Sequence, residues 1–91
     1  MSRIDPDSAW ELHPQVSVRP EPFGALLYHF GTRKLSFLKD RTLLTVVESL
    51  ADAATARAAC EAAGVADEHV PTYLTALGTL AESKMLVERA A

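Results

Sequence analysis

The spacing of apolar residues changes once along this chain, and the change divides it into two halves with different secondary structure. Before residue 39, apolar side chains recur at about every second position, which is typical of β-strands. After residue 40 they recur at the spacing of an amphipathic helix, beginning with Leu43, Leu44, Val46, Val47 and Leu50. A chain with strands first and helices afterwards packs its helices on one face of a sheet, so the pattern predicts an α+β fold.

The first half contains three predicted strands. Residues 15–19 form the first, and we expect it to stop at Pro20-Glu21-Pro22, because a proline has no N–H to donate. Residues 24–30 form the second strand, with an aromatic-rich set of side chains on one face and a mixed set on the other, which predicts at least partial cover on both faces. Gly31-Thr32 makes a tight connection to the third strand, residues 34–38, which we expect at an edge of an antiparallel meander.

The second half contains three predicted helices. Asp40 and Thr55 are suitable N-caps for the first two, and Gly64 ends the second as a left-handed residue. Asp67 or a neighbour opens the third, where Pro71 is acceptable in the first turn. The predicted fold class is therefore α+β, with a three-stranded antiparallel sheet followed by three helices, similar to a winged helix-turn-helix.

We expect one domain, because 91 residues do not suffice for two independent cores. Residues 1–12 show no apolar period and are predicted to be a flexible, loosely attached tail, with Trp10 and Leu12 able to tack its end onto the core. Residues 13–91 then form the domain itself. The apolar segment 85–87 is expected to dock back on it.

Several classes of function are excluded by composition and spacing. The single cysteine, Cys60, rules out an internal disulfide and any Cys-clustered zinc or iron–sulfur site. The histidines His13, His29 and His69 lack the spacing of metal ligands, and neither a nucleophile–base pattern nor a phosphate-binding loop is present. No signal peptide and no apolar run of roughly 20 residues occur. We therefore expect a soluble, cytoplasmic protein that is not an enzyme, holds no cofactor and contacts no membrane.

Positive charge is concentrated in one short segment of a chain whose net charge is −3. Residues 31–41 carry four basic side chains and one acidic one, and they lie between two acidic segments. The basic residues are Arg33, Lys34, Lys39 and Arg41. Such a segment is either a solvated strand edge or a surface that attracts an acidic partner.

Two kinds of binding function remain. A winged helix-turn-helix that reads DNA needs basic or amide side chains on its recognition helix, whereas the third predicted helix carries Asp67, Glu68 and Glu82. We therefore expect no nucleic-acid partner and keep DNA binding as the alternative. A peptide-binding module instead pairs an extended peptide with the free edge of the third strand. Tyr73 and Leu77 on the third helix either line the resulting groove or belong to the core.

A family resemblance favours the peptide-binding alternative. The chain resembles the chaperones of the mycofactocin precursor peptide, which are PqqD-like recognition elements for ribosomally made, modified peptides, over roughly residues 10–87. The resemblance rests on the segments His13-Pro14-Gln15-Val16, Arg19-Pro20-Glu21-Pro22-Phe23-Gly24-Ala25-Leu26-Leu27-Tyr28-His29-Phe30 and Leu35-Ser36-Phe37-Leu38.

The resemblance implies that the chain binds the leader of the precursor peptide and presents its core to a radical SAM maturase. That enzyme, which carries the iron–sulfur clusters, decarboxylates the C-terminal tyrosine of the precursor and crosslinks it to the neighbouring valine. In the wider family the leader adds as a strand along the third strand and packs against the third helix. The positions that correspond here are Arg33, Lys34, Leu35, Ser36, Phe37, Leu38, Tyr73 and Leu77.

Overall fold

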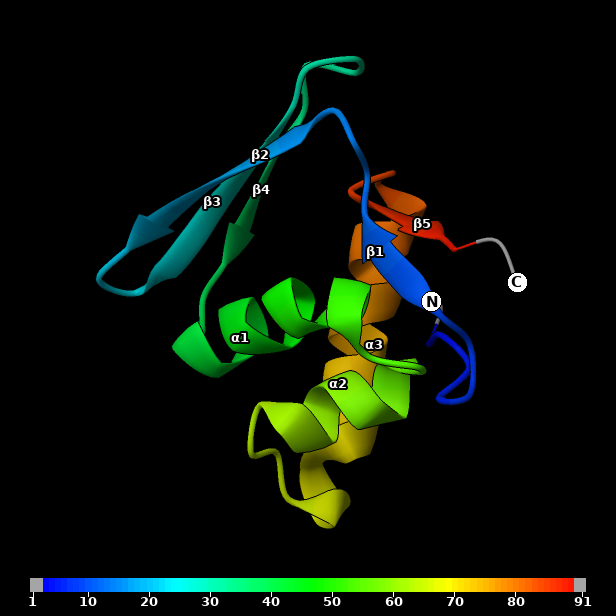
Figure 1. Ribbon diagram of the computed structural model, residues 1–91. Coiled ribbons are helices and arrows are strands. Elements are labelled where there is room, and N and C mark those ends of the chain that lie inside the picture. The colour runs from blue at the N-terminus through cyan, green and yellow to red at the C-terminus, as the bar shows by residue number, and fades with distance from the viewer. Residues whose placement is uncertain (1–2, 90–91) are drawn as a thin grey trace.

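The structure, a computed structural model, describes residues 3–89 and contains two small antiparallel sheets and three α-helices (Figure 1). A three-stranded sheet in the order β2-β3-β4 is followed by the helices, which confirms the predicted α+β class. The elements are β1 (Trp10–Leu12), β2 (Val16–Glu21), β3 (Gly24–His29), β4 (Leu35–Leu38), α1 (Arg41–Ser49), the 3₁₀ turn η1 (Leu50–Asp52), α2 (Ala56–Ala62), the 3₁₀ turn η2 (Asp67–His69), α3 (Val70–Glu82) and β5 (Leu86–Glu88).

The register of the β3–β4 hairpin determines which backbone groups of β4 face away from the sheet. The His29 N–H donates to the Lys34 carbonyl at 3.0 Å, and Leu27 lies opposite Ser36. In an antiparallel ladder, hydrogen-bonded and non-bonded pairs alternate. Ser36 therefore bonds inward to β3, whereas the N–H and C=O groups of Leu35 and Phe37 point outward.

Strand β2 ends at Glu21, inside the predicted stop at Pro20-Glu21-Pro22, but it passes through Pro20, so the missing N–H of this proline is not what ends the ladder. The Phe30 N–H donates to the Gln15 carbonyl at 2.9 Å, and Pro20 lies opposite Ala25. The same alternation turns the nitrogen of Pro20 away from β3, toward the outside of an edge strand. A proline at such a position removes no hydrogen bond between β2 and β3, because the backbone nitrogen there faces solvent.

The helices cover only one face of the three-stranded sheet, which we call the inner face. Ala25, Leu27 and His29 of β3 point to this face and are buried. The aromatic-rich set of β3 lies on the opposite, outer face, where Phe30 is 62% exposed. The prediction of at least partial cover on both faces therefore agrees with the half-buried Leu26 and Tyr28, whereas Phe30 at the end of the outer face is exposed.

The N-terminal segment packs on the domain, in contrast to the loosely attached tail that we expected over residues 1–12. Ile4 is buried in the core, and the Pro6 and Ser8 carbonyls accept hydrogen bonds from the Arg57 and Ala56 N–H groups of α2. Strand β1 pairs with β5, so the expected docking of the 85–87 segment is confirmed and takes the form of a second sheet. Residues 1 and 2 of that predicted tail lie outside the described residues.

The helix ends follow the predicted caps. The Asp40 carboxylate accepts the Thr42 N–H at 2.7 Å, and the Thr55 hydroxyl accepts the Ala58 N–H at 3.1 Å. Gly64 has a φ of 83° after α2, and the Val65 N–H bonds back to the Cys60 carbonyl. These caps satisfy backbone groups that a helix end otherwise leaves unpaired.

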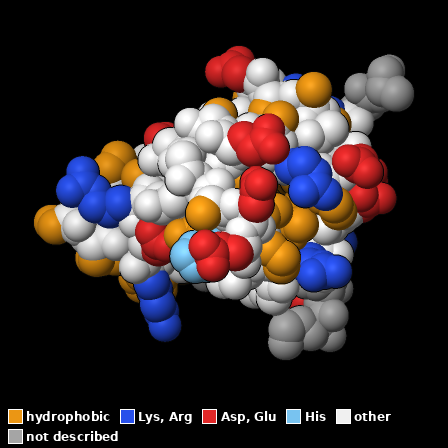
Figure 2. All heavy atoms as spheres, turned by 90° about the horizontal axis from the view of Figure 1, so that it is seen from below, with side chains coloured by type: hydrophobic (Ala, Val, Ile, Leu, Met, Phe, Trp, Pro, Cys, Tyr) orange, Lys and Arg blue, Asp and Glu red, His pale blue; other side chains and the backbone are white. Residues whose placement is uncertain are grey.

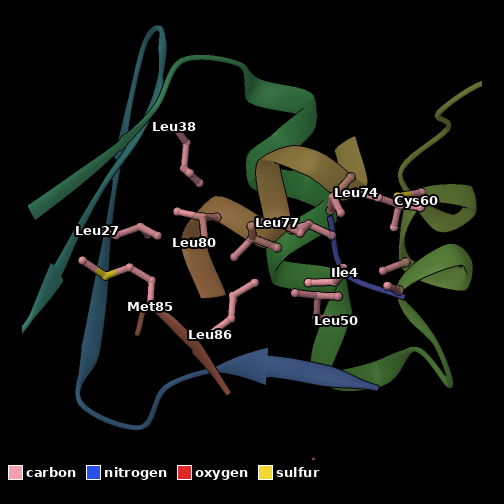
Figure 3. Close-up of a cluster of buried hydrophobic side chains, with 14 of the residues drawn as sticks. Ile4, Leu27, Leu38, Leu50, Cys60, Leu74, Leu77, Leu80, Met85 and Leu86 are labelled. Carbon is pink, nitrogen blue, oxygen red and sulfur yellow. The ribbon is translucent and has the colours of Figure 1, made fainter. Parts of the chain in front are cut away.

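The core lies between the inner face of the sheet and α3 (Figure 3). Leu27 and Leu38 point from the sheet toward Leu77 and Leu80 of α3, and Met85 closes the lower side (Figure 3). The chain leaves β4 so close to β3 that a Cβ on Gly24 would lie 2.0 Å from the Leu38 carbonyl oxygen. A glycine is therefore required at the first position of β3, opposite the point where the chain leaves β4 for α1.

Candidate functional site

The outer edge of β4 carries unpaired backbone groups within easy reach of solvent. The Leu35 and Phe37 side chains, on either side of Ser36, are 55% and 60% exposed, and their backbone N–H and C=O groups point away from β3. A row of outward N–H and C=O groups on an exposed strand is a template for pairing with another extended chain.

The opposite edge of the sheet, on β2, offers fewer donors. Pro20 has no N–H, and the Val16 N–H already donates to the His13 carbonyl at 2.9 Å. Among the outward-facing positions of β2, Val18 alone keeps an N–H for a new partner. An added strand therefore finds better pairing on β4.

A pocket of about 360 Å³ opens between the start of α1 and the N-terminal half of α3, directly after the end of β4. Its lining combines apolar and polar side chains, namely Asp40, Leu43, His69, Thr72, Tyr73 and Ala76. Asp40 follows Leu38 by two residues, so the pocket continues from the C-terminal end of the β4 edge.

A hydrogen bond between Tyr73 and Asp40 joins α3 to the start of α1 at the wall of this pocket. The Tyr73 hydroxyl donates to a carboxylate oxygen of Asp40 at 2.5 Å. This bond is the main reason why the pKa of Asp40 lies below its usual value, and the Thr42 and Leu43 N–H groups act in the same direction. The same bond, together with burial, raises the pKa of Tyr73. The pocket therefore holds a carboxylate that stays ionised at neutral pH.

The structure brings most of the predicted site residues together along β4. Arg33 lies in the turn before the strand with a φ of 63°, and Lys34 is exposed beside it. Tyr73 is half-buried and reaches the far end of the strand through Asp40. The Ser36 side chain lies on the inner face, because its position alternates with those of Leu35 and Phe37.

Two predicted site residues belong to the core instead. Leu77 is 0% exposed and Leu38 is 1% exposed, so neither side chain is accessible to a peptide on the surface. Leu77 faces the sheet from the centre of α3 (Figure 3). Its helical spacing correctly indicated the side of α3 that faces the rest of the domain, but it could not tell a groove position from a core position. Of the two alternatives for Leu77, its burial favours the core over the groove.

The charged side chains are unevenly distributed over the molecule. Figure 2 shows basic and hydrophobic side chains close together at the end where the sheet lies, and acidic side chains, with further basic ones between them, over the helices. Arg33, Lys34, Lys39 and Arg41 are all exposed, and they occupy the two ends of β4. This distribution favours an acidic partner at the β4 edge.

Sequence reasoning missed the pocket and the exposed aromatic face. Asp40 was predicted only as an N-cap, although its place directly after the edge strand was a signal that it borders the site. A second hollow, of about 470 Å³ between α1 and α2, is lined by small residues together with Glu48 and Asp52 and touches no predicted site residue.

Neither of two other kinds of site occurs in the part of the chain that the structure describes. Across residues 3–89, no cluster of three His, Cys, Asp or Glu side chains is placed to hold a metal ion. No helix there is both long and apolar enough to cross a membrane.

Comparison with known proteins gives a consistent result. Residues 9–87 match the model of the Peptide chaperone MftB family. A curated protein named peptide chaperone MftB from Mycobacterium tuberculosis is 66% identical over 88 residues, which cover 97% of this chain and 81% of that protein. The protein of the same name from Mycobacterium ulcerans is 69% identical over 89 residues, with 97% and 81% covered.

A third relative with this name, from Mycolicibacterium smegmatis, is 69% identical over 84 residues, which cover 92% of this chain and 82% of the relative. No solved structure gives a significant match.

Proposed function

Because the chain belongs to the Peptide chaperone MftB family, whose members are not enzymes, we propose that it binds the leader of the mycofactocin precursor peptide along β4 and presents it to a radical SAM maturase. The family indicates a peptide or protein partner. The open edge of β4 is the observation that carries the more specific proposal.

Strand addition fits the chemistry of this edge. The leader supplies N–H and C=O groups to those of Leu35 and Phe37, and main-chain hydrogen bonds of this kind give affinity with little dependence on sequence. Each contributes about 0.5–1.5 kcal/mol net. The basic side chains at both ends of β4 favour a leader with acidic residues near the paired segment.

The pocket beside β4 supports a role in specificity. Side chains of an added strand alternate between the two faces of the sheet, so every second leader residue points to the inner side, where the pocket opens. Its wall of Leu43 and Ala76 is apolar, and Asp40 and Tyr73 supply polar groups at one side. One leader side chain in this pocket fixes the register of the added strand.

Two proline variants of neighbouring residues test the proposal. Phe37→Pro removes an N–H that points outward, so the protein is expected to fold, as Pro20 does on the opposite edge, and to lose leader binding by at least about tenfold. Ser36→Pro removes an N–H that bonds to β3 and is expected to destabilise the fold. Thermal unfolding and titration with a labelled leader peptide separate these effects.

The side chain of Phe37 requires its own control, because proline removes the ring as well as the N–H. Phe37→Ala keeps the N–H and is expected to retain most of the leader affinity. A folded Phe37→Pro variant that binds the leader with wild-type affinity would show that β4 is not the docking edge.

A further inference from the structure

The outer face of the three-stranded sheet carries exposed large hydrophobic side chains, and pairing of a leader strand with the edge of β4 does not explain why they are there. Resting on the proposed function, we infer that this face, together with the bound leader strand, is the surface on which the modifying enzyme docks. The occupant is a protein surface with an apolar centre and an acidic rim.

The exposed large hydrophobic side chains of residues 3–89 all belong to this sheet or its turns. Leu35 and Phe37 lie on its outer face, with Phe30 beyond β3 and Phe23 in the β2–β3 turn, and each is 48–62% exposed. Phe23 lies 6.4 Å from Phe37, and Phe30 meets Tyr28 edge-on at 5.0 Å, both measured between ring centroids. Leu35, on the same face as Phe37, lies directly opposite Tyr28 and joins the two aromatic pairs into one surface. A contiguous apolar patch of this kind marks an interaction site.

A second copy of the chain is a poor occupant for this face. A half-exposed large apolar side chain presents about 100 Å², so the three phenylalanines and Leu35 together present about 400 Å² per copy. Two copies would then bury about 800 Å², below the roughly 1,200 Å² of a stable interface. Self-association through this face would also bring together exposed basic side chains at the two ends of β4, such as Arg33 and Lys39.

The charged groups near the face point to an acidic partner. Arg19 on the outer face is 75% exposed and forms an ion pair with Glu21 at 2.7 Å, so these two charges offset each other. The Asp40 carboxylate keeps its charge, but it lines the pocket between α1 and α3. The exposed side chains of Arg33, Lys34, Lys39 and Arg41 outnumber it and make the two ends of β4 basic.

A bound leader enlarges this face. A fourth strand on β4 places every second leader side chain on the outer face, next to Leu35 and Phe37. A protein that docks there touches the chaperone and the leader at once. The leader and the enzyme should therefore strengthen each other's binding, and by the same factor.

The test measures binding of the purified radical SAM maturase to the chaperone, with and without a saturating synthetic leader peptide. For the wild type, the leader is expected to tighten enzyme binding by at least about fivefold, the lower end of common coupling between sites. Phe30→Ser, which lies away from the β4 edge, is expected to weaken enzyme binding by about tenfold or more and to leave leader affinity within about twofold. Phe30→Leu restores an apolar side chain and should recover most enzyme binding.

The outcomes separate this inference from the proposed function. If the wild type does not bind the leader, the proposed function fails. The outer face is then tested by comparing enzyme binding of the wild type and of Phe30→Ser, both without leader. Unchanged enzyme binding by a folded Phe30→Ser variant overturns the docking surface. Wild-type self-association that Phe30→Ser abolishes also overturns it, because a second copy would then be the occupant. Arg57→Ala, exposed on α2, serves as a control for substitutions elsewhere.

Discussion

The Asp40 carboxylate serves two structural purposes with its two oxygens. One oxygen caps α1 through the Thr42 N–H, and the other accepts the Tyr73 hydroxyl from α3. The same group forms part of the pocket wall beside β4. The helix cap, the packing of α3 and the shape of the site are therefore linked through one ionised side chain.

Removing the Tyr73 hydroxyl is expected to destabilise the protein in a pH-dependent way. The pKa of Asp40 is lowered in the folded state, so its contribution is complete above the unfolded pKa of 3.8 and is lost as pH falls through the folded value. We expect Tyr73→Phe to cost about 1 kcal/mol at pH 7, and we expect the difference from the wild type to shrink below about pH 4. Urea unfolding across this pH range measures it.

Tyr28→Phe is the matched control, because Tyr28 is half-buried on the outer face and does not contact Asp40. It is expected to change stability by less than about 0.5 kcal/mol at every pH. A Tyr73→Phe difference that stays constant from neutral to acid pH would argue against the role of the Asp40 charge.

Strand β1 and the segment before it form an element that completes α2. The Pro6 and Ser8 carbonyls accept the first two N–H groups of that helix, and Ile4 fills the core. These are backbone groups that a helix cannot satisfy by itself. The N-terminal segment therefore contributes to the stability of a helix that follows it by more than forty residues in the sequence.

Deletion of residues 1–8 is expected to lower the free energy of unfolding by about 3–5 kcal/mol. Exposure of Ile4 costs about 1.5–3 kcal/mol, and the two hydrogen bonds to α2 contribute about 0.5–1.5 kcal/mol each. Denaturant unfolding measures the loss, and Arg3→Ala, which leaves Ile4 in place, should change little. A truncated chain as stable as the full one would show that the segment is only loosely attached.

The strands and helix ends that could be predicted from the sequence are those whose residue pattern lies within a few consecutive positions. The 24–30 and 34–38 strands and the Asp40 and Thr55 caps have patterns within a few residues. Strands β1 and β5 have three residues each, and each is completed by a partner far along the chain, so no local period reveals them.

The site was predictable only in part for a related reason. Alternation indicates that Leu35 and Phe37 share a face, but the direction of their N–H groups follows from the register with β3. The depth of Leu77 in the core, likewise, depends on the sheet that packs over it, not on its helical spacing. Which face of the sheet the helices cover depends on how the chain turns after β4, because both faces of β3 carry apolar residues.

The distribution of charge over the molecule predicts the kinetics of leader binding. Basic side chains occupy both ends of β4, and acidic ones lie mainly over the helices. At low salt, where the Debye length is about 30 Å at 0.01 M, the basic end attracts an acidic leader before contact. Attraction of this kind raises the association rate more than it changes dissociation.

The double variant Arg33→Ala/Lys39→Ala is therefore expected to associate more slowly and to show a flatter dependence on salt than the wild type. Stopped-flow measurements with labelled leader, from about 0.01 M to about 0.15 M salt, test this. Arg3→Ala/Arg57→Ala removes the same charge away from β4 and should behave like the wild type. If the association rates of both double variants depend on salt in the same way, the basic side chains near β4 do not attract the leader, and the segment is an ordinary solvated strand edge.

Proline on one edge of the sheet also limits how the protein can assemble with itself. In the terms of polymer chemistry, a sheet with two open edges is a bifunctional monomer and can grow without end, whereas a sheet with one open edge is monofunctional. With Pro20 and the occupied Val16 N–H on β2, one added strand saturates this sheet. Chains that have not yet bound their peptide can therefore pair with one another mainly through β4, and this restricts the growth of a fibril through the three-stranded sheet.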